Sequence, residues 1–389
     1  GKIKNFNFVY DCGSTYKEPL QRAIDNYILS LGSNNKIEFL VLSHLHNDHV
    51  SGLNQLMAKA EIKQVIMPYF SPIERLILAL KRINLAAWYY KFLSDPVSYL
   101  LENGVEKVII FGKSNNENTE AKTITDLDEL PDDNTLRDEI LEREPNLKRA
   151  YAEKRLLIKQ HHGYWNPHGI WEFIFFNHKI QESKLDQFRD CINNKGYLYD
   201  NDILRKTIAN KAALQHLKEC YKVINNDLNF TSLLLFHGPA ENSISNTQII
   251  IVNNISNPFC GKAGVLICAN CSIYENGCPY ILKSLFEPSP YYQLLTGDIK
   301  LNGHVIYELQ RHFGCRLNSL TVCLVPHHGS KRSWNNDILK ATPNCYMWIT
   351  SAGAGNSYMH PSRSVIKSLL HANRNVYYAN ELSEVIIKG

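Results

Sequence analysis

The chain of 389 residues lacks any run of eighteen apolar residues, and this absence predicts that no helix spans a membrane. We also expect no signal peptide, because the first residues lead straight into a predicted strand. The ten cysteines lack the spacing of a secreted disulfide framework, which favours a reducing compartment. We therefore expect a cytoplasmic protein that does not act at a membrane.

The chain also has little net charge, only +4, but this small value hides an asymmetry. Residues 115–150 contain eleven acidic and five basic side chains, so the rest of the chain carries about +10. An excess of positive charge suits an anionic substrate, although many cytoplasmic proteins are mildly basic. Hydrophobic residues make up 44% of the chain, which is enough for a sizeable core.

Imidazoles are concentrated in one short stretch. Three histidines and one aspartate occupy six positions, namely His44, His46, Asp48 and His49. The apolar residues 39–42 before the stretch predict a buried strand, and residues 52–60 after it predict the start of a helix. Neutral imidazole and carboxylate are natural ligands of divalent first-row metals, and packing explains such a cluster poorly. The stretch therefore predicts a metal site at a strand-to-helix turn.

Further polar side chains lie at or soon after the ends of predicted strands. They are Asp11, Asp298, His327, His328 and His360. Asp298 ends a Thr-Gly-Asp turn, and the two adjacent histidines begin a His-His-Gly-Ser sequence. Each turn alone is common, whereas their order along the chain is specific.

The motifs His-x-His-x-Asp-His, Thr-Gly-Asp and His-His-Gly-Ser, in this order, resemble the metallo-β-lactamase superfamily. The last motif is most similar to the branch of ComEC, a DNA-processing competence protein. The resemblance covers residues 5–115 and roughly 225–380. It implies an α/β fold, with the whole chain, residues 1–389, forming a single metallo-β-lactamase αββα sandwich. The chain has no membrane channel like that of ComEC, so DNA uptake is not implied.

The resemblance implies a centre with two divalent ions, with zinc expected first and manganese as the alternative. His44 and His46 would bind the first ion, and Asp48 and His49 would bind the second. Asp298 would lie between the two ions, because a bridging carboxylate suits dications about 3.5–4 Å apart.

The resemblance also assigns supporting and substrate-contacting residues. One imidazole of the His-His pair would complete the second metal site; we prefer His328 as the ligand and His327 as a contact to a substrate oxygen. The sequence leaves that order open. Asp11 would orient the metal loop from behind the ligands. His360 would donate a proton to a leaving oxygen or neutralise a phosphate, unless it only caps the following helix.

The first metal site departs from the superfamily pattern. In many members a ligand histidine lies just before the strand that corresponds to residues 233–236, whereas here Asp227 and Asn229 hold that place. Water, Asp227 or Asn229 would then complete the site. His237, at the far end of the strand, is a further candidate.

Four of the ten cysteines fall within nineteen residues, namely Cys260, Cys268, Cys271 and Cys278. The second and third have the two-residue spacing with which a pair of thiolates shares one tetrahedral zinc. Two interpretations stay open. Either the four thiols hold a structural zinc in an inserted loop, or they are unrelated.

Three segments interrupt the alternation of strands and helices that is typical of a layered α/β fold. Residues 113–168 are charged, residues 181–225 predict two helices, and residues 254–282 contain the cysteine cluster. We expect all three to be insertions through which a protein partner would bind. Elsewhere the pattern predicts a helix over 16–31, and Ser71 begins another.

The chemistry that the resemblance implies is hydrolysis. Two divalent ions lower the pKa of bound water from about 15.7 toward 7, so that hydroxide forms at neutral pH and no serine or cysteine nucleophile is needed. Lys331 and Arg332 would help to hold the substrate oxygens. We predict Asp48, His327 and His360 as catalytic residues of a phosphodiesterase or nuclease, with nucleic acid or another phosphodiester as substrate.

Two other functions stay open, because this fold carries many chemistries. The first is a hydrolase of a small ester, lactone or nucleotide. The second is a regulatory or binding protein whose metal site is incomplete at Asn229.

Overall fold

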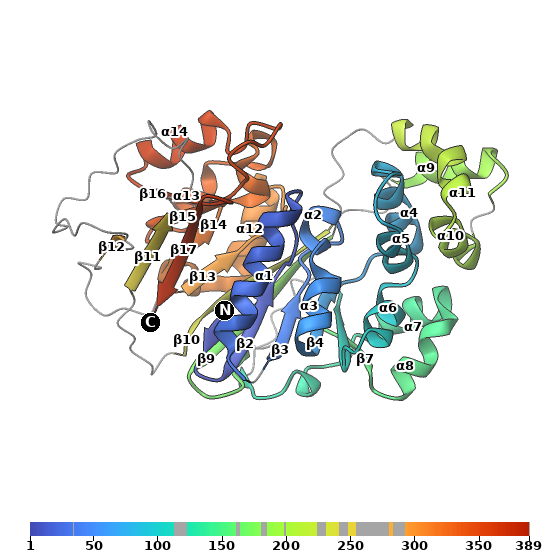
Figure 1. The fold of residues 1–389 in the computed structure, drawn as a ribbon, viewed down its shortest axis with the longest axis horizontal. Helices are drawn as coiled ribbons and strands as arrows, with labels where there is room; N and C mark the ends of the chain where they lie inside the picture. The colour runs from blue at the N-terminus through green and yellow to red at the C-terminus, as the bar shows by residue number, and fades with distance from the viewer. Residues whose placement is uncertain are drawn as a thin grey trace. The chain divides into compact units, whose positions relative to one another are not determined.

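The computed structural model describes residues 1–33, 35–112, 123–160, 164–179, 185–197, 200–223, 231–240, 248–253, 280–282 and 292–388 (Figure 1). The chain divides into two compact units. The first comprises Gly1–Gly163 and Phe175–Leu234, and the second comprises Tyr164–Ile174 and Leu235–Gly389. None of the helices in the described ranges has both the length and the apolar character needed to cross a membrane.

A six-stranded sheet in the order β1-β2-β3-β4-β5-β7 forms the centre of the first unit. The strands are Lys2–Ile3, Phe6–Tyr10, Lys36–Val41, Glu61–Pro68, Lys107–Phe111 and Leu156–Lys159. β2, β3, β4, β5 and β7 are parallel, and β1 pairs antiparallel with β2. Phe39, Leu40 and Val41 at the end of β3 are fully buried. A parallel strand covered on both faces requires such a continuous apolar run, and β3 delivers the chain to the metal loop.

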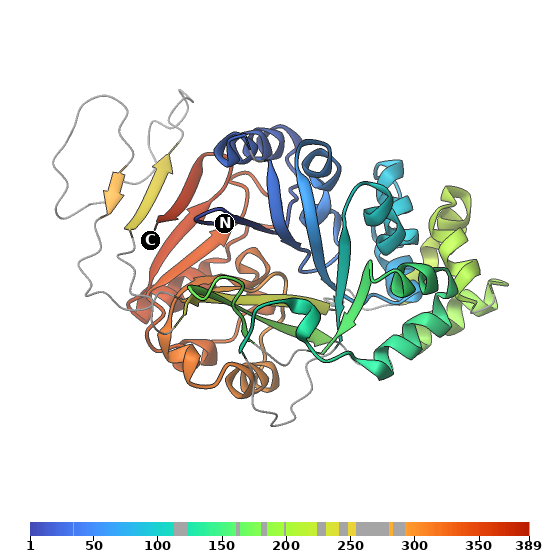
Figure 2. The ribbon, with the colours of Figure 1, turned by 90° about the horizontal axis from the view of Figure 1, so that it is seen from below.

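Helices connect these parallel strands, as the sequence predicts. They are α1 (Lys17–Leu31), α2 (Asn47–Val50), α3 (Leu53–Lys59), α4 (Pro72–Lys81), α5 (Ala87–Ser94) and α6 (Pro96–Glu102). Figure 2 shows α1 lying along one face of the sheet. α4 begins with the predicted capping box, in which the Ser71 amide donates to Glu74 Oε2 over 2.7 Å. The mixed α/β architecture is therefore confirmed.

The rest of the first unit is mainly helical. Its elements are β6 (Thr123–Ile124), α7 (Asn134–Arg143), α8 (Lys148–Ala152), α9 (Asp186–Asn194), α10 (Asn201–Ile208) and α11 (Lys211–Leu217). α10 packs against both α4 and α5. A disulfide joins Cys191 in α9 to Cys220 in the 3-10 turn Lys218–Val223, a pairing that the sequence analysis does not anticipate.

Two parts of the predicted insertions differ from expectation. Residues 183–224 contain three described α-helices rather than two, because Asp200 and Asn210 each accept hydrogen bonds from backbone amides that follow them and so start new helices.

Residues 156–159 lie in the predicted insertion 113–168 but form β7, which pairs with β5. The charged neighbours of this short apolar run conceal it in the sequence.

The second unit is built on a sheet that contains, in order, β16-β15-β14-β13-β10-β9-β8. These strands are Asn375–Ala379, Met347–Ser351, Leu320–Leu324, Tyr292–Leu295, Thr231–Pro239, Trp171–Lys179 and Tyr164–Trp165. β13 to β16 are parallel, and the division between the units falls within β9 and within β10. α12 (Gly303–Phe313), α13 (Asp337–Ala341) and α14 (Arg363–His371) connect the parallel strands. β11 (Gln248–Asn253) pairs with β12 (Tyr280–Leu282) and with β17 (Ser383–Lys388).

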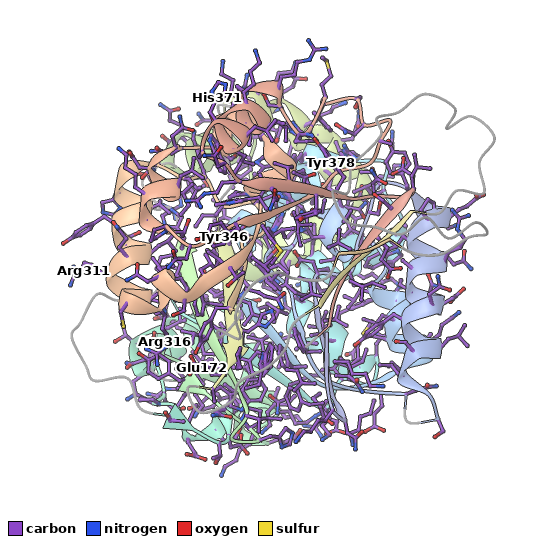
Figure 3. All side chains as sticks on the ribbon, turned by 90° about the vertical axis from the view of Figure 1, so that its left-hand side faces the viewer. Glu172, Arg311, Arg316, Tyr346, His371 and Tyr378 are labelled. Atoms are coloured by element: carbon purple, nitrogen blue, oxygen red, sulfur yellow. A yellow bond between two sulfur atoms is a disulfide. The ribbon has the colours of Figure 1, made fainter. Side chains whose placement is uncertain are left out.

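A polar cluster lies in the second unit beside β9 (Figure 3). Glu172 is 6% exposed, and its Oε1 accepts from Tyr292 Oη over 2.8 Å and from Arg316 Nε over 3.1 Å. The Arg316 guanidinium also lies 3.8 Å from the centre of the Tyr164 ring. The buried carboxylate is thus neutralised and hydrogen-bonded, as burial of a charge requires.

A buried ion pair fixes α4 to the end of α7 in the first unit. The side chains of Arg75 and Glu144 are 1% and 3% exposed, respectively, and they are paired directly. Arg75 also donates to the carbonyl oxygen of Ser94 over 2.8 Å, and Tyr69 Oη donates to Glu144 Oε1 over 3.1 Å. The ion pair therefore anchors part of the segment 113–168 to the helix that follows β4.

Replacement of Arg75 by methionine leaves the Glu144 carboxylate buried without its cation. We expect the free energy of unfolding to fall by about 3–5 kcal/mol, measured by urea denaturation. The control is Lys206→Met on α10, whose ammonium pairs with Asp202 at an exposed surface. That change should cost less than about 1 kcal/mol, and equal losses in the two variants would contradict the assignment.

Candidate metal centre

The predicted metal loop of the first unit follows directly after β3. His46 lies at the N-terminal cap of the short helix α2, and Asp48 and His49 lie within that helix. His44, His46 and His49 are 3%, 7% and 6% exposed. Three buried imidazoles on one short turn are costly unless they have polar partners, so the loop requires an explanation beyond packing.

Asp11 supplies part of that explanation. Its Oδ1 accepts from the Ser43 amide over 2.7 Å, and its Oδ2 accepts from Ser43 Oγ over 2.6 Å. The same Oδ2 lies 2.8 Å from His49 Nδ1. Asp11 adopts a positive φ of 55°, which is uncommon for a residue other than glycine. One carboxylate therefore fixes both the start and the end of the metal loop.

The hydrogen bonds also determine which ring nitrogens face a metal. His44 Nδ1 lies 2.8 Å from Ser43 Oγ, as His49 Nδ1 lies against Asp11, so Nε2 is the candidate ligand atom of both rings. The His44 and His49 ring centres are 3.8 Å apart, and those of His44 and His46 are 4.7 Å apart. Asp11, His44 and His49 also form a group whose ligand atoms lie within 4.8 Å of one another.

The backbone after Asp11 packs directly on the metal loop. The Cys12 amide donates to the His49 carbonyl oxygen over 2.9 Å, and the Gly52 amide donates to the Cys12 carbonyl oxygen over 2.9 Å. A Cβ at Gly13 would lie 2.4 Å from the His49 carbonyl carbon and 2.5 Å from the Asp48 carbonyl oxygen. Only glycine fits this approach, which explains the Asp-Cys-Gly sequence after β2.

The second unit holds further predicted site residues, at the ends of β13 and β14. His327 Nε2 lies 3.5 Å from Asp298 Oδ2, and His328 Nε2 lies 3.8 Å from Asp298 Oδ1. His327 Nδ1 lies 2.9 Å from Ser333 Oγ, whereas His328 Nδ1 lies 2.5 Å from the Ser351 carbonyl oxygen. Both rings thus present Nε2 to the buried carboxylate.

The loop that carries His360 packs beside this group within the second unit. The His327 and His360 ring centres are 6.1 Å apart. Asn356 fixes the loop, because its side chain donates to the His360 carbonyl oxygen and accepts from the His360 amide. Gly329 has a φ of 86°, and a Cβ there would lie 2.4 Å from Pro361 Cβ, so the His-His-Gly turn and the loop fit only through a glycine.

His360 is half-buried and its Nδ1 atom has no hydrogen-bond partner within the described ranges. Burial lowers the pKa of His360, and His328 lowers it further, whereas Asp298 acts in the opposite direction. The neutral ring is therefore favoured near neutral pH, which suits a proton acceptor or a hydrogen-bond donor better than a permanent cation.

The remaining candidates fall elsewhere. His237 lies on β10 in the second unit, where it is 3% exposed and accepts from Trp171 Nε1 over 3.2 Å. Its ring also packs on Phe173, with ring centres 5.9 Å apart. The burial of His237 and its contacts with two aromatic side chains are typical of a histidine packed in the core. Asp227, Asn229 and the four predicted zinc-binding cysteines, Cys260, Cys268, Cys271 and Cys278, lie outside the described residues.

The serine residues that orient the imidazoles are not among those that the sequence predicts. Ser43 precedes His44 directly and has the hydroxyl needed to bind a neighbouring ring, so the sequence contained a usable indication of its role. Ser333 and Ser351 lie 6 and 23 residues from their histidine partners, and only the folded chain brings them together.

The donor set fits a divalent metal. Imidazole nitrogen and carboxylate oxygen are the ligands that zinc and its neighbours prefer, and here they are buried. The second ring nitrogen of His44 and that of His49 each contact a hydroxyl or a carboxylate, which is the usual support of a metal-binding histidine.

Comparison with known proteins agrees with this interpretation. Residues 2–76 match the model of the Metallo-beta-lactamase superfamily, and this range contains Asp11 and the whole metal loop. The two parallel-rich sheets with their helices agree with the α/β fold of that superfamily. Its members are generally hydrolytic metalloenzymes, so the match indicates a metal-dependent hydrolase. No curated protein matches the chain.

The Asp11→Ala variant should keep its fold but bind zinc about 10- to 100-fold more weakly, because His49 and Ser43 lose the carboxylate that orients them. Competition with a chromophoric chelator measures the affinity. The matched control is Asp25→Ala on α1, where the carboxylate pairs with Lys59 instead. Unchanged zinc affinity in Asp11→Ala would show that the loop holds its shape without the carboxylate.

Burial lowers the pKa of His237 from 6.5 to about 3, so the folded state resists protonation of this ring. Between these two values the unfolded chain binds the proton more readily, and stability is lost as the pH falls. When the pH is lowered from 7 to 5, the free energy of unfolding should fall by about 2 kcal/mol because of this residue. Urea denaturation of His237→Gln should lack that part of the pH dependence, and an identical pH profile would contradict it.

Proposed function

We propose that this protein is a dinuclear metallohydrolase that cleaves phosphodiesters, with nucleic acid as the substrate class. The observation that carries the proposal is the oriented set of imidazoles in the loop after β3, together with the carboxylate and imidazoles at the ends of β13 and β14. The His-His-Gly-Ser sequence, which resembles that of the ComEC branch, favours nucleic acid over other substrates.

In this proposal the predicted ligands hold two divalent ions. His44 and His46 hold the first ion, and Asp48 and His49 hold the second. Asp298 and His328 would supply a further carboxylate and imidazole for these ions. Zinc is the expected metal, because the donor set is rich in imidazole, and manganese is the alternative.

The ions, when bound, supply a nucleophile from water at neutral pH and offset negative charge that develops on the substrate. The chain's own contribution is orientation. Ser43 and Asp11 fix the His44 and His49 rings through Nδ1, so these rings need no rearrangement when they bind. His327 and His360, whose ring centres lie 6.1 Å apart, are placed to donate hydrogen bonds to substrate oxygens.

Basic side chains close to these imidazoles favour an anionic substrate. Lys331 and Arg332 follow the His-His-Gly-Ser turn and are exposed. The acidic segment 115–150 accounts for so many carboxylates that the rest of the chain carries about +10. A phosphodiester brings one negative charge per linkage, which this excess attracts over a distance of about 8–10 Å at physiological salt.

A substrate panel tests the proposed function. The zinc-loaded and manganese-loaded proteins are incubated with bis-p-nitrophenyl phosphate, with plasmid DNA and with p-nitrophenyl acetate. We expect hydrolysis of both phosphodiesters and loss of this activity in EDTA. Cleavage of the acetate alone would replace the proposal with a small-ester hydrolase. Loss of every activity in a protein that binds fewer than two ions would support a binding or regulatory protein.

The Asp48→Ala variant should lose phosphodiester turnover by about 100-fold or more, because metal ligation supplies several kcal/mol of transition-state stabilisation. Its circular dichroism and unfolding midpoint should stay close to those of the unmodified protein. Asp202→Ala, at an exposed position of α10, is the matched control and should retain full turnover. Full turnover in Asp48→Ala with bound metal would reject this site.

A further inference from the structure

Lys81 is the last residue of α4 and differs from the rest of that helix. Residues 72–80 are all buried, whereas Lys81 is exposed. Its ammonium nevertheless contacts the metal loop, because Nζ lies 3.3 Å from His46 Nε2. Both residues belong to the first unit, and 35 positions of sequence separate them. A lysine that approaches a predicted metal-binding ring is unusual, because it brings a positive charge to a site for cations.

Two adjacent tyrosines hold this end of α4 against the metal loop. Tyr89 is 1% exposed, and its hydroxyl donates to the carbonyl oxygen of Leu45, between His44 and His46, over 2.8 Å. The Tyr90 hydroxyl donates to the Arg82 carbonyl oxygen over 2.7 Å and accepts from the Leu85 amide over 3.0 Å. The turn that follows Lys81 is thereby fixed, so the proximity of Lys81 to His46 is built into the fold.

The charge of Lys81 is also available for a ligand. Several other lysines of the first unit pair with carboxylates, as Lys36 does with Glu61 and Lys59 with Asp25. Within the described ranges, Lys81 pairs with no carboxylate; its one hydrogen-bond partner is His46. An ammonium has three donors and acts as a compact point charge, which makes lysine a common phosphate-binding residue.

We propose that Lys81 binds a nonbridging oxygen of the phosphodiester substrate, and this inference rests on the proposed function. An ammonium and a divalent ion repel each other, so Lys81 directs its donors to an anionic oxygen when His46 acts as a ligand. Lys81 thus selects for a negatively charged substrate. It is a substrate-binding residue, and it leaves the number of bound ions unchanged.

The experiment measures phosphate binding and metal content separately from turnover. Lys81→Met removes the charge and keeps much of the length of the side chain, whereas Lys81→Arg keeps the charge. Lys91→Met, at an exposed position of α5, is the matched control. Each zinc-loaded protein is titrated with inorganic phosphate by calorimetry, its zinc content is measured by mass spectrometry, and KM and kcat are measured with bis-p-nitrophenyl phosphate.

We expect Lys81→Met to bind phosphate about 10- to 100-fold more weakly and to raise KM by a similar factor, with unchanged zinc content. Lys81→Arg should recover much of the affinity, and Lys91→Met should behave as the unmodified protein. Equal phosphate affinity in Lys81→Met and the unmodified protein would overturn the inference. Loss of zinc from Lys81→Met would also overturn it, because Lys81 would then support the metal site itself.

The proposed function and this inference fail in different ways. Weaker phosphate binding by Lys81→Met, in a protein that hydrolyses no phosphodiester, would support the role of Lys81 and reject the proposed reaction. Phosphodiester hydrolysis with the same KM in the unmodified protein and in Lys81→Met would support the reaction and reject the role of Lys81. Failure of the unmodified protein to bind phosphate at all would reject Lys81 as an anion-binding residue.

Discussion

The candidate centre depends on the contacts of one carboxylate, Asp11. It accepts from the Ser43 amide and hydroxyl at the beginning of the metal loop and contacts His49 Nδ1 at its end. Because β2 and β3 are parallel neighbours, the ends of these strands lie side by side, and Asp11 reaches the loop without distortion of the sheet. The position of the imidazoles is therefore a consequence of strand register and of one short-range set of hydrogen bonds.

The same principle recurs at the ends of β13 and β14. Ser333 and Ser351 engage the Nδ1 atoms of His327 and His328, and Asp298 faces both Nε2 atoms. Each unit thus carries its own oriented donors just after the ends of parallel strands. In the first unit, α4 brings Lys81 to the metal loop, and α10 packs against α4 and α5.

The sequence predicts much of this framework for identifiable reasons. The apolar run of β3 and the density of imidazoles after it are local features, and the capping box at Ser71 is a local signature of a helix start. Features that depend on contacts between residues far apart in the sequence are not predictable in this way. β7 is short and surrounded by charge, the Cys191–Cys220 disulfide depends on how α9 to α11 fold back, and Ser351 meets His328 only through the pairing of β14 with β15. The start of α11 at Asn210 is only partly predictable from the sequence. Asn210 is a residue type that caps helices, but the same residue type is equally common in loops.

The proposed function requires that the predicted donors bind two divalent ions. Native mass spectrometry tests this requirement by counting the zinc ions bound to each protein. The unmodified protein, His44→Ala and Asp298→Ala are each compared with their own metal-free mass. We expect two chelator-removable ions in the unmodified chain and fewer bound ions in both variants, because His44 and Asp298 are both proposed ligands. Full zinc content in Asp298→Ala, with loss only in His44→Ala, would contradict the proposal that Asp298 is a metal ligand.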